Sequence, residues 1–228
     1  ILLVDKPVGM VVHEDESGDS DTLINRIKSY LYHKGEYHPE NELSFAPALC
    51  NRIDRNTCGI VIAAKNAESL RILNQIRDRE LTKLYLCIAC GKVTPDSATL
   101  TAYLEKNSDT NTVKISDKKT KSNLTIKTKY KVIAYNGENS LLKVDLLTGR
   151  THQIRAHLAY IGHALLGDGK YGNNKLNKKY GFKYQALCSY ELQFKFTTDA
   201  GFLSYLDGKC FKAKAPDFVK MFGSNIKL

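Results

Sequence analysis

The chain has 228 residues and a mass of 25.6 kDa, long enough to bury a sizeable core without disulfides or metal ions. Its shares of hydrophobic residues (43%) and charged residues (25%) are those of a globular protein and exclude a disordered or fibrous chain. The unusual value is the formal net charge of +10 at pH 7, which favours a partner that carries phosphates, such as a nucleic acid. No apolar run approaches the roughly 18 residues of a membrane span, so we expect no membrane partner.

The first elements of the chain read as a strand, a turn and a second strand within residues 1–12, where Lys-Pro and Val-Gly interrupt two apolar runs. Because the chain starts inside a strand-like run with no signal peptide, we expect an upstream segment to be missing. Thr22 and Asn66 each precede an apolar stripe at helical spacing, which predicts two capped scaffold helices, the second ending near residues 77–80. Residues 14–21 and 35–47 read as loops.

Residues 48–66 carry the first candidate chemistry. Arg52, Asp54 and Arg55 stand just before the apolar run of residues 60–64, which predicts a buried strand. Two flanking guanidiniums favour an ionised carboxylate, which suits a nucleophile or a base and does not suit a general acid. The alternative is an ordinary solvated ion pair on the surface.

Residues 83–90 predict another strand, with Lys83 and Tyr85 on one face. Tyr85 is either a half-buried core residue or a flat aromatic surface for a base. Cys87 and Cys90, two of six cysteines, form a C-x-x-C here, but residues three apart on a strand point to opposite faces. We therefore expect no metal, and free thiols in a reducing cytoplasm.

Residues 93–135 predict meandering antiparallel strands at 99–104, 113–116 and 124–132. Their many lysines predict a solvated edge that discourages strand aggregation, and an RNA-facing surface is the alternative. These lysines lie at positions 114, 118, 119, 121, 127, 129 and 131.

The next segment predicts a strand at residues 140–147 and then a helix capped by Thr151 and ended by Gly162. His152 and His157 are five residues apart, roughly 140° around a helix, so they do not share a metal ion. Residues 173–184 read as a basic loop. A strand from Tyr184, a strand at 209–215 and a short helix at the end complete the pattern.

Three separated segments, in order, resemble the RluA-type pseudouridine synthases, which isomerise uridines in ribosomal and transfer RNA. The first is Lys-Pro-Val-Gly-Met with a following Val-His, and the second is Arg-Ile-Asp-Arg-Asn-Thr-Cys-Gly, followed later by Lys-x-Tyr. The third is Gly-Arg-Thr-His-Gln-Ile-Arg-Ala-His-Leu with a following Gly-Asp-Gly-Lys-Tyr-Gly. Two departures flank the carboxylate: Asn51 stands where many members have His, and Cys58 where many have Ser.

The resemblance implies an α+β class with the pseudouridine synthase fold, a mixed, mostly antiparallel sheet flanked by helices. It implies one catalytic domain over residues 1–228, with the missing upstream segment as the place for a small RNA-binding domain. The implied catalytic residues are Asp54, Tyr85, which lies against the uracil, and Arg155, which pairs with Asp54. Arg52 enters the space that the flipped base leaves. The further residues implied to bind RNA or the base are Arg55, Leu187, Arg150, His152 and Gln153.

The implied reaction converts uridine to pseudouridine without cofactor or metal, in structured RNA, with 23S ribosomal RNA favoured over transfer RNA, in a monomer. One alternative is a transfer-RNA-directed synthase, and another is an RNA-binding module that keeps the fold without turnover. Intact Arg52, Asp54, Tyr85 and Arg155 argue against the second. A metal-dependent nuclease or hydrolase needs clustered carboxylates, which the sequence does not show.

Overall fold

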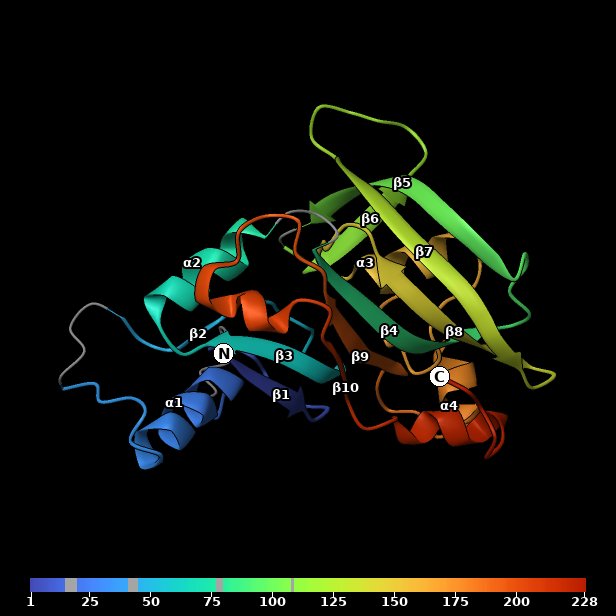
Figure 1. The fold of residues 1–228 in the computed structure, drawn as a ribbon. Helices are drawn as coiled ribbons and strands as arrows, with labels where there is room; N and C mark the ends of the chain where they lie inside the picture. Colours follow the sequence, from blue (N-terminus) through green and yellow to red (C-terminus); the bar gives the residue numbers. More distant parts are fainter. Residues whose placement is uncertain (15–19, 41–44, 77–79, 108) are drawn as a thin grey trace. The chain divides into compact units, whose positions relative to one another are not determined.

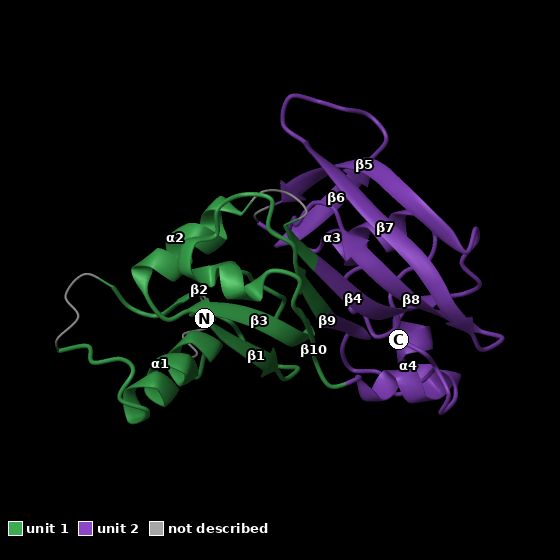
Figure 2. Cartoon of the chain, viewed as in Figure 1, with its two compact units in different colours: residues 1–82, 191–214 green, residues 83–190, 215–228 purple. Residues whose placement is uncertain are grey.

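A computed structural model describes residues 1–14, 20–40, 45–76, 80–107 and 109–228 (Figure 1). The chain divides into two compact units: unit 1 comprises residues 1–82 and 191–214, and unit 2 comprises residues 83–190 and 215–228 (Figure 2). The chain passes between the units three times, and two of these boundaries fall inside strands, β4 (Leu81–Cys90) and β9 (Leu187–Phe194). None of the helices in the described ranges is long and apolar enough to cross a membrane.

Unit 1 is built on β3 (Cys58–Ala64), whose residues 59–64 are all buried, as the apolar run predicts. β1 (Leu2–Lys6) and β2 (Ala48–Leu49) pair with it, both antiparallel. At the other end of the unit's sequence, β10 (Cys210–Lys212) pairs with the second half of β9, again antiparallel. The predicted second strand near residues 11–12 is wrong, because these residues form a bend whose carbonyls accept from the start of the first helix.

The two predicted helices of unit 1 are confirmed as α1 (Leu23–His33) and α2 (Ala67–Gln75). Thr22 and Asn66 cap them, each with a side-chain oxygen that accepts from a backbone N–H three residues later. The predicted end of α2 at 77–80 falls partly outside the described residues. The core packs α2, β3, β9 and a short 3-10 helix, η1 (Gly201–Leu206), around Ile62, Leu192 and Leu203.

Unit 2 contains an antiparallel run of strands in the order β4-β8-β7-β5-β6. The bounds are β5 (Ser97–Asn107), β6 (Thr112–Ser116), β7 (Leu124–Tyr135) and β8 (Asn139–Leu146). This confirms the predicted meander, and the α+β class with a mostly antiparallel sheet is confirmed for the described strand pairs.

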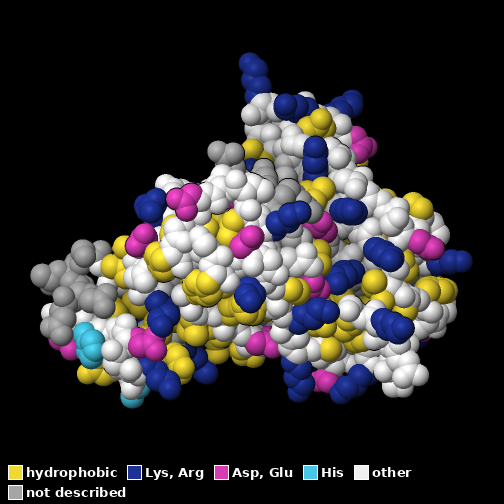
Figure 3. Space-filling model, viewed as in Figure 1, with side chains coloured by type: hydrophobic (Ala, Val, Ile, Leu, Met, Phe, Trp, Pro, Cys, Tyr) yellow, Lys and Arg dark blue, Asp and Glu magenta, His cyan; other side chains and the backbone are white. Residues whose placement is uncertain are grey.

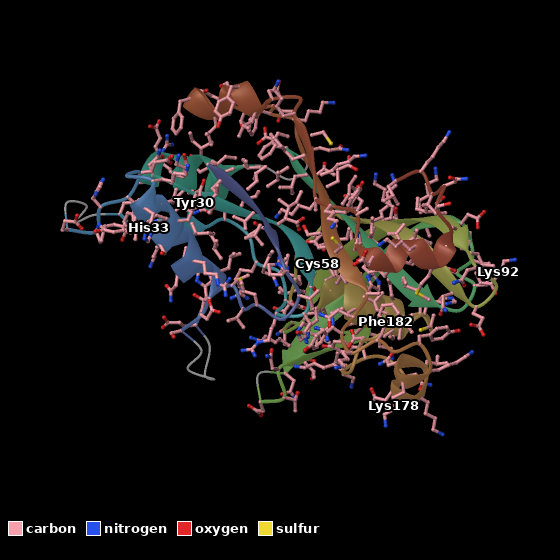
Figure 4. All side chains as sticks on the ribbon, turned by 90° about the horizontal axis from the view of Figure 1, so that it is seen from below. Tyr30, His33, Cys58, Lys92, Lys178 and Phe182 are labelled. Carbon is pink, nitrogen blue, oxygen red and sulfur yellow. The ribbon has the colours of Figure 1, made fainter. Side chains whose placement is uncertain are left out.

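One face of this sheet is covered by α3 (Gln153–Tyr160), whose Ala156 packs against Ala102, Leu104 and Ile126. A second cluster joins Ile88 to Leu166, Ala186 and Phe182 and to the C-terminal 3-10 helix η2 (Asp217–Phe222); Figure 4 labels Phe182. Residues 173–184 were predicted to be a loop, which is wrong in part, because Asn173 caps α4 (Asn174–Lys179) through its side chain.

The start of α3 also differs from the prediction. The N-cap residue is His152, not Thr151, and it makes no side-chain cap hydrogen bond. His152 has φ +52° and ψ +17°, a left-handed conformation that is uncommon for residues other than glycine. Such conformations persist where the surroundings hold them, and they cluster at functional sites.

Candidate active site

The loop that carries Asp54 lies between β2 and β3 in unit 1. Its carboxylate is partly exposed, while Arg52 and Arg55 on either side are exposed. The loop is closed by the Thr57 N–H, which donates to the Asp54 carbonyl at 3.0 Å. A second bond joins it to the first segment of the chain, because the Gly9 N–H donates to the Arg55 carbonyl at 2.9 Å.

Buried Lys6 links the first segment of the chain to the Asp54 loop through hydrogen bonds. Its side chain is fully buried, and its Nζ donates to the carbonyls of Pro7 (2.9 Å), Met10 (2.9 Å) and Arg55 (3.0 Å). Burial lowers the pKa of Lys6 from 10.5 to about 8, although the charges of Cys58 and Asp54 oppose that shift. Lys6 therefore holds the Asp54 loop in place and lies close enough to Asp54 for the two charges to interact.

Asn51, one of the two departures, has a structural use in this loop. Its Oδ1 accepts from the Ile62 N–H at 2.7 Å, which ties the residue three before Asp54 to the buried strand β3. Its Nδ2 is buried and has no hydrogen-bond partner among the described residues. The departure from His thus keeps a side chain that anchors the loop.

Arg52 belongs to a cationic group on unit 1. Burial lowers the pKa of His13, and the positive charges of Arg52 and Lys28 lower it further. A lowered pKa leaves His13 less charged, so the cations near it are Arg52 and Lys28. These two cations favour an anionic partner, which agrees with the predicted contact between Arg52 and RNA. The prediction itself stays untested.

Tyr85 lies on β4 in unit 2, and 6% of it is exposed. Strand register places it opposite Val144, which is opposite Tyr130 on β7. Tyr130 shares its face with Thr128, whose hydroxyl contacts His157 of α3 at 3.0 Å, so Tyr85 lies on the sheet face that α3 covers.

Arg155, on α3, is 5% exposed and forms a two-pronged ion pair with fully buried Asp168. Arg155 Nε donates to Asp168 Oδ2 at 2.7 Å, and Nη2 donates to Oδ1 at 3.0 Å. The guanidinium also lies over the Tyr171 ring, with Cζ 5.3 Å from the ring centre. Burial acts to raise the pKa of Asp168, but the hydrogen bond and charge of Arg155, with the N–H groups of Tyr171 and Lys170, hold it below its usual value.

Tyr171 joins this ion pair to the start of α3. Its hydroxyl accepts from the Val113 N–H at 2.8 Å and lies 2.9 Å from His152 Nδ1, and the two rings meet edge to face. The Tyr171 oxygen already accepts from Val113, so the hydroxyl can donate its one proton to His152 Nδ1. Tyr171 therefore contacts Arg155 with its ring and holds the left-handed His152 with its hydroxyl.

Gln153 has its amide inside unit 2. Its Nε2 donates to the Lys127 carbonyl and the Thr128 hydroxyl, both at 3.0 Å, and its Oε1 accepts from Thr148 Oγ1 (2.9 Å) and the Arg150 N–H (3.1 Å). Its side chain is 2% exposed. This burial argues against the prediction that Gln153 contacts RNA directly. It supports a role in fastening α3 to β7.

The remaining predicted residues of unit 2 differ in exposure. Arg150 is exposed, His152 is partly exposed, and Leu187 is buried at the start of β9. His157 is 1% exposed, and burial lowers its pKa to about 4, so it is neutral at physiological pH. No group of three or more His, Cys, Asp or Glu within the described ranges is arranged to hold a metal ion.

The structure thus places three of the predicted residues in unit 1 and six in unit 2. The prediction that Arg155 pairs with Asp54 joins residues of different units and stays a prediction. Sequence reasoning assigned no role to Lys6, Asp168 or Tyr171. All three lie in segments that carry the family resemblance, Lys6 in Lys-Pro and the other two in Gly-Asp-Gly-Lys-Tyr-Gly, and that position was the signal that could have pointed to them.

Comparisons with known proteins agree on one family. The profile described as RNA pseudouridylate synthase matches residues 1–160. An uncharacterized RNA pseudouridine synthase of Mycoplasma genitalium is 37% identical over 202 residues, 85% of this chain and 60% of that protein. Ribosomal large subunit pseudouridine synthase D of Borreliella burgdorferi is 33% identical over 174 residues, 75% of this chain and 52% of that protein. The chain therefore matches little more than half the length of these relatives.

Solved structures show the same fold. Human RNA pseudouridylate synthase domain containing 1 superposes with a TM-score of 0.67 at 21% identity, covering 94% of this chain and 79% of that one. Human RNA pseudouridylate synthase domain containing 4 superposes with a TM-score of 0.72 at 19% identity, covering 96% of this chain and 87% of that one.

Proposed function

Because this chain belongs to the RNA pseudouridylate synthase family, we propose that it isomerises a uridine of structured RNA to pseudouridine. The observation that carries the proposal is the Arg-Ile-Asp-Arg loop, which Lys6 and Gly9 fasten to the first segment of the chain within the matched region. The basic charge of the chain supports an RNA partner. Large-subunit ribosomal RNA is the favoured substrate, supported by the name of the relative from Borreliella burgdorferi.

The proposed reaction breaks the bond between N1 of uracil and C1′ of ribose, turns the uracil, and joins C5 to C1′. The proton on C5 leaves, and N1 gains one, so the product is an isomer of the substrate. Asp54 acts as the nucleophile at C1′ or as the base that removes a sugar proton, and an ionised carboxylate suits both roles. The target base must leave the helix stack to reach it.

The other predicted residues support this step. Tyr85 stacks on the flipped uracil and assists loss of the C5 proton, and Arg155 keeps Asp54 charged. Arg52 stacks in the space that the base leaves, which its planar guanidinium allows. Asp168 and Tyr171 hold the Arg155 guanidinium from two directions, so its orientation is set before RNA binds.

The test is release of tritium from ribosomal RNA labelled at uracil C5. Asp54→Asn should abolish release and leave RNA binding nearly unchanged, because the amide keeps the size of the side chain and loses its nucleophilic oxygen. Asp217→Asn removes the same charge from an exposed ion pair in unit 2 and should leave release unchanged. Retained release in Asp54→Asn would refute the assignment, and RNA binding with no release from the parent protein would favour a non-catalytic RNA-binding module.

A further inference from the structure

Three lysines form a row on the central strand of unit 2, on the face away from α3. Lys127, Lys129 and Lys131 of β7 are exposed, and the residues between them, Thr128 and Tyr130, are buried on the face that α3 covers. Alternate residues of an antiparallel strand lie about 6.8 Å apart, so the three ammonium groups form a line along one surface. We call these three residues the β7 lysine row.

The position of β7 rules out the explanation that the sequence suggested. Lysines on an edge strand discourage pairing with other chains. β7, however, is paired on both sides, with β5 through Lys127, Lys129 and Lys131 and with β8 through Lys129 and Lys131. A central strand has no open edge to protect, so the β7 lysine row needs another explanation.

The neighbours of the row leave it strongly cationic. On β5 the opposite residues are Thr101, Thr99 and Ser97, which carry hydroxyl groups and no charge. On β8, Lys143 is opposite Lys131 and adds a cation, while Asp145 is opposite Lys129 and offsets one charge. Figure 3 shows Lys and Arg side chains gathered over the strands of unit 2. Ammonium and hydroxyl groups bind phosphate oxygens. The row and these neighbours on β5 and β8 carry no Asn or Gln side chains that could read base edges, so this surface suits the phosphate backbone.

One end of the row meets a predicted RNA-binding segment. The Lys127 N–H donates to Thr148 Oγ1 at 2.9 Å, and the Lys127 carbonyl accepts from Gln153 Nε2. Thr148 lies two residues before exposed Arg150 in the turn that leads to α3. The row therefore ends beside the turn that carries Arg150, and RNA held at that turn can continue along β7.

We propose that the β7 lysine row is a second RNA-binding surface, which holds the phosphate backbone of a stem next to the one that contains the target uridine. The inference deepens the proposed function, since the partner is the RNA of the same reaction. Such a surface adds affinity for large structured RNA without reading sequence. It also explains cationic side chains on a face of the sheet that carries none of the predicted catalytic residues of unit 2.

The experiment compares two triple variants of the full chain. The row variant carries Lys127→Gln, Lys129→Gln and Lys131→Gln. The control carries Lys175→Gln, Lys178→Gln and Lys183→Gln, which remove the same charge from exposed residues at and after α4 in the same unit; Figure 4 labels Lys178. Binding to a labelled RNA duplex of about 25 base pairs is measured from 50 to 300 mM salt, since each phosphate contact adds about 0.9 to the slope of log affinity against log salt.

The row variant should bind the duplex about 10- to 100-fold more weakly at low salt, with the slope reduced by about 2 to 3, and the control should stay within about threefold of the parent. An equal loss in both variants would overturn the proposal, because it would show a general effect of net charge. No loss in the row variant would overturn it too. So would row-dependent binding to anionic lipid vesicles without row-dependent binding to RNA.

Tritium release by the parent protein separates this inference from the proposed function. If neither the parent nor any variant releases tritium but the row variant still loses duplex affinity, the second surface stands and the proposed reaction fails. If the parent releases tritium and the row variant binds the duplex like the parent, the reaction stands and the second surface fails. Circular dichroism of all variants should match the parent, because the substituted side chains are exposed.

Discussion

Among the described residues, a buried cation in each unit holds a segment that carries predicted site residues, but the two cations are stabilised by different partners. In unit 1, Lys6 donates to three neutral backbone carbonyls. In unit 2, Arg155 shares two hydrogen bonds with the buried carboxylate of Asp168 and lies over the Tyr171 ring. Carbonyls satisfy the N–H donors of a cation but supply no full negative charge, whereas a carboxylate supplies both.

The difference shows in how each cation responds to pH. The pKa of Lys6 falls to about 8, because burial outweighs the attraction of Cys58 and Asp54. Arg155 stays protonated at any pH at which proteins fold, and its charge holds the pKa of Asp168 below the usual range. In unit 1, the cation that holds the loop, Lys6, therefore loses its charge in mild base. In unit 2, the Arg155–Asp168 ion pair keeps its charges in mild base, and it is lost when one partner is removed.

The largest effect is expected from breaking the pair in unit 2. Asp168→Asn leaves Arg155 buried without its carboxylate, which should cost about 3–5 kcal/mol of unfolding free energy. Urea denaturation followed by circular dichroism measures it. Asp217→Asn, which breaks an exposed pair with Lys220, should cost under about 1 kcal/mol. Similar losses for the two variants would show that the buried pair is no stronger a constraint than a surface pair.

The next effect concerns the loop that presents Asp168. A Cβ at Gly172 would lie 2.4 Å from the Asp168 carbonyl oxygen and 3.1 Å from that of Leu165, so Gly172→Ala must move backbone. We expect a loss of about 2–4 kcal/mol in the same assay. Gly169→Ala, three residues earlier in the same loop, meets nothing within 4 Å and should change stability by less than about 1 kcal/mol. Equal tolerance of both substitutions would contradict a rigid loop.

In unit 1, Lys6→Met keeps the apolar stem and removes three hydrogen bonds, which should cost about 1–3 kcal/mol at pH 7. Because the folded pKa (about 8) is below the usual 10.5, the folded protein binds fewer protons between these values. Stability of the parent relative to Lys6→Met should therefore rise as pH increases from about 8 to 10.5.

Unfolding curves of both proteins across that pH range measure the difference. Lys209→Met, at an exposed lysine of the same unit, is the control and should show no such rise relative to the parent. A parent that loses stability relative to Lys6→Met over the same range would contradict the depressed pKa of Lys6.

The sequence predicted the elements of both units well where the local signal is strong. The caps at Thr22 and Asn66 accept from a backbone N–H three residues later, so they follow from the local sequence. The apolar run after Asp54 is itself the signal of a buried strand. The prediction failed at Thr151, because His152 takes a left-handed conformation that Tyr171, 19 residues later, helps to hold. Long-range contacts of that kind leave no periodic signal.

The candidate site divides in the same way. Asp54, Tyr85 and Arg155 came from matched segments, and their mutual arrangement stays a prediction. Lys6 and Asp168 stand in matched segments too, but their roles did not follow from the sequence because they are tertiary: Lys6 reaches a carbonyl 49 residues away, and Asp168 reaches Arg155 13 residues away. Gln153 was predicted to bind RNA because it stands in the third segment of the family resemblance, yet its amide bonds to β7. Adjacency in sequence on a helix does not fix a shared face.

The smallest effect is expected from removing the hydroxyl of Tyr171. This substitution separates the contact of the ring with Arg155 from the contact of the hydroxyl with His152. Tyr171→Phe keeps the ring beneath Arg155 and removes the hydroxyl that accepts from Val113 and contacts His152. It should cost about 1 kcal/mol, whereas Tyr135→Phe, at an exposed hydroxyl on the Gly137 carbonyl, should cost less than about 0.5 kcal/mol. Tyr171→Leu also removes the ring and should cost more than Tyr171→Phe, because the cation then loses its aromatic partner. Equal costs for Phe and Leu would mean that the Tyr171 ring does not help to hold Arg155, and the contrast between the units would then rest on the carboxylate and not on the ring.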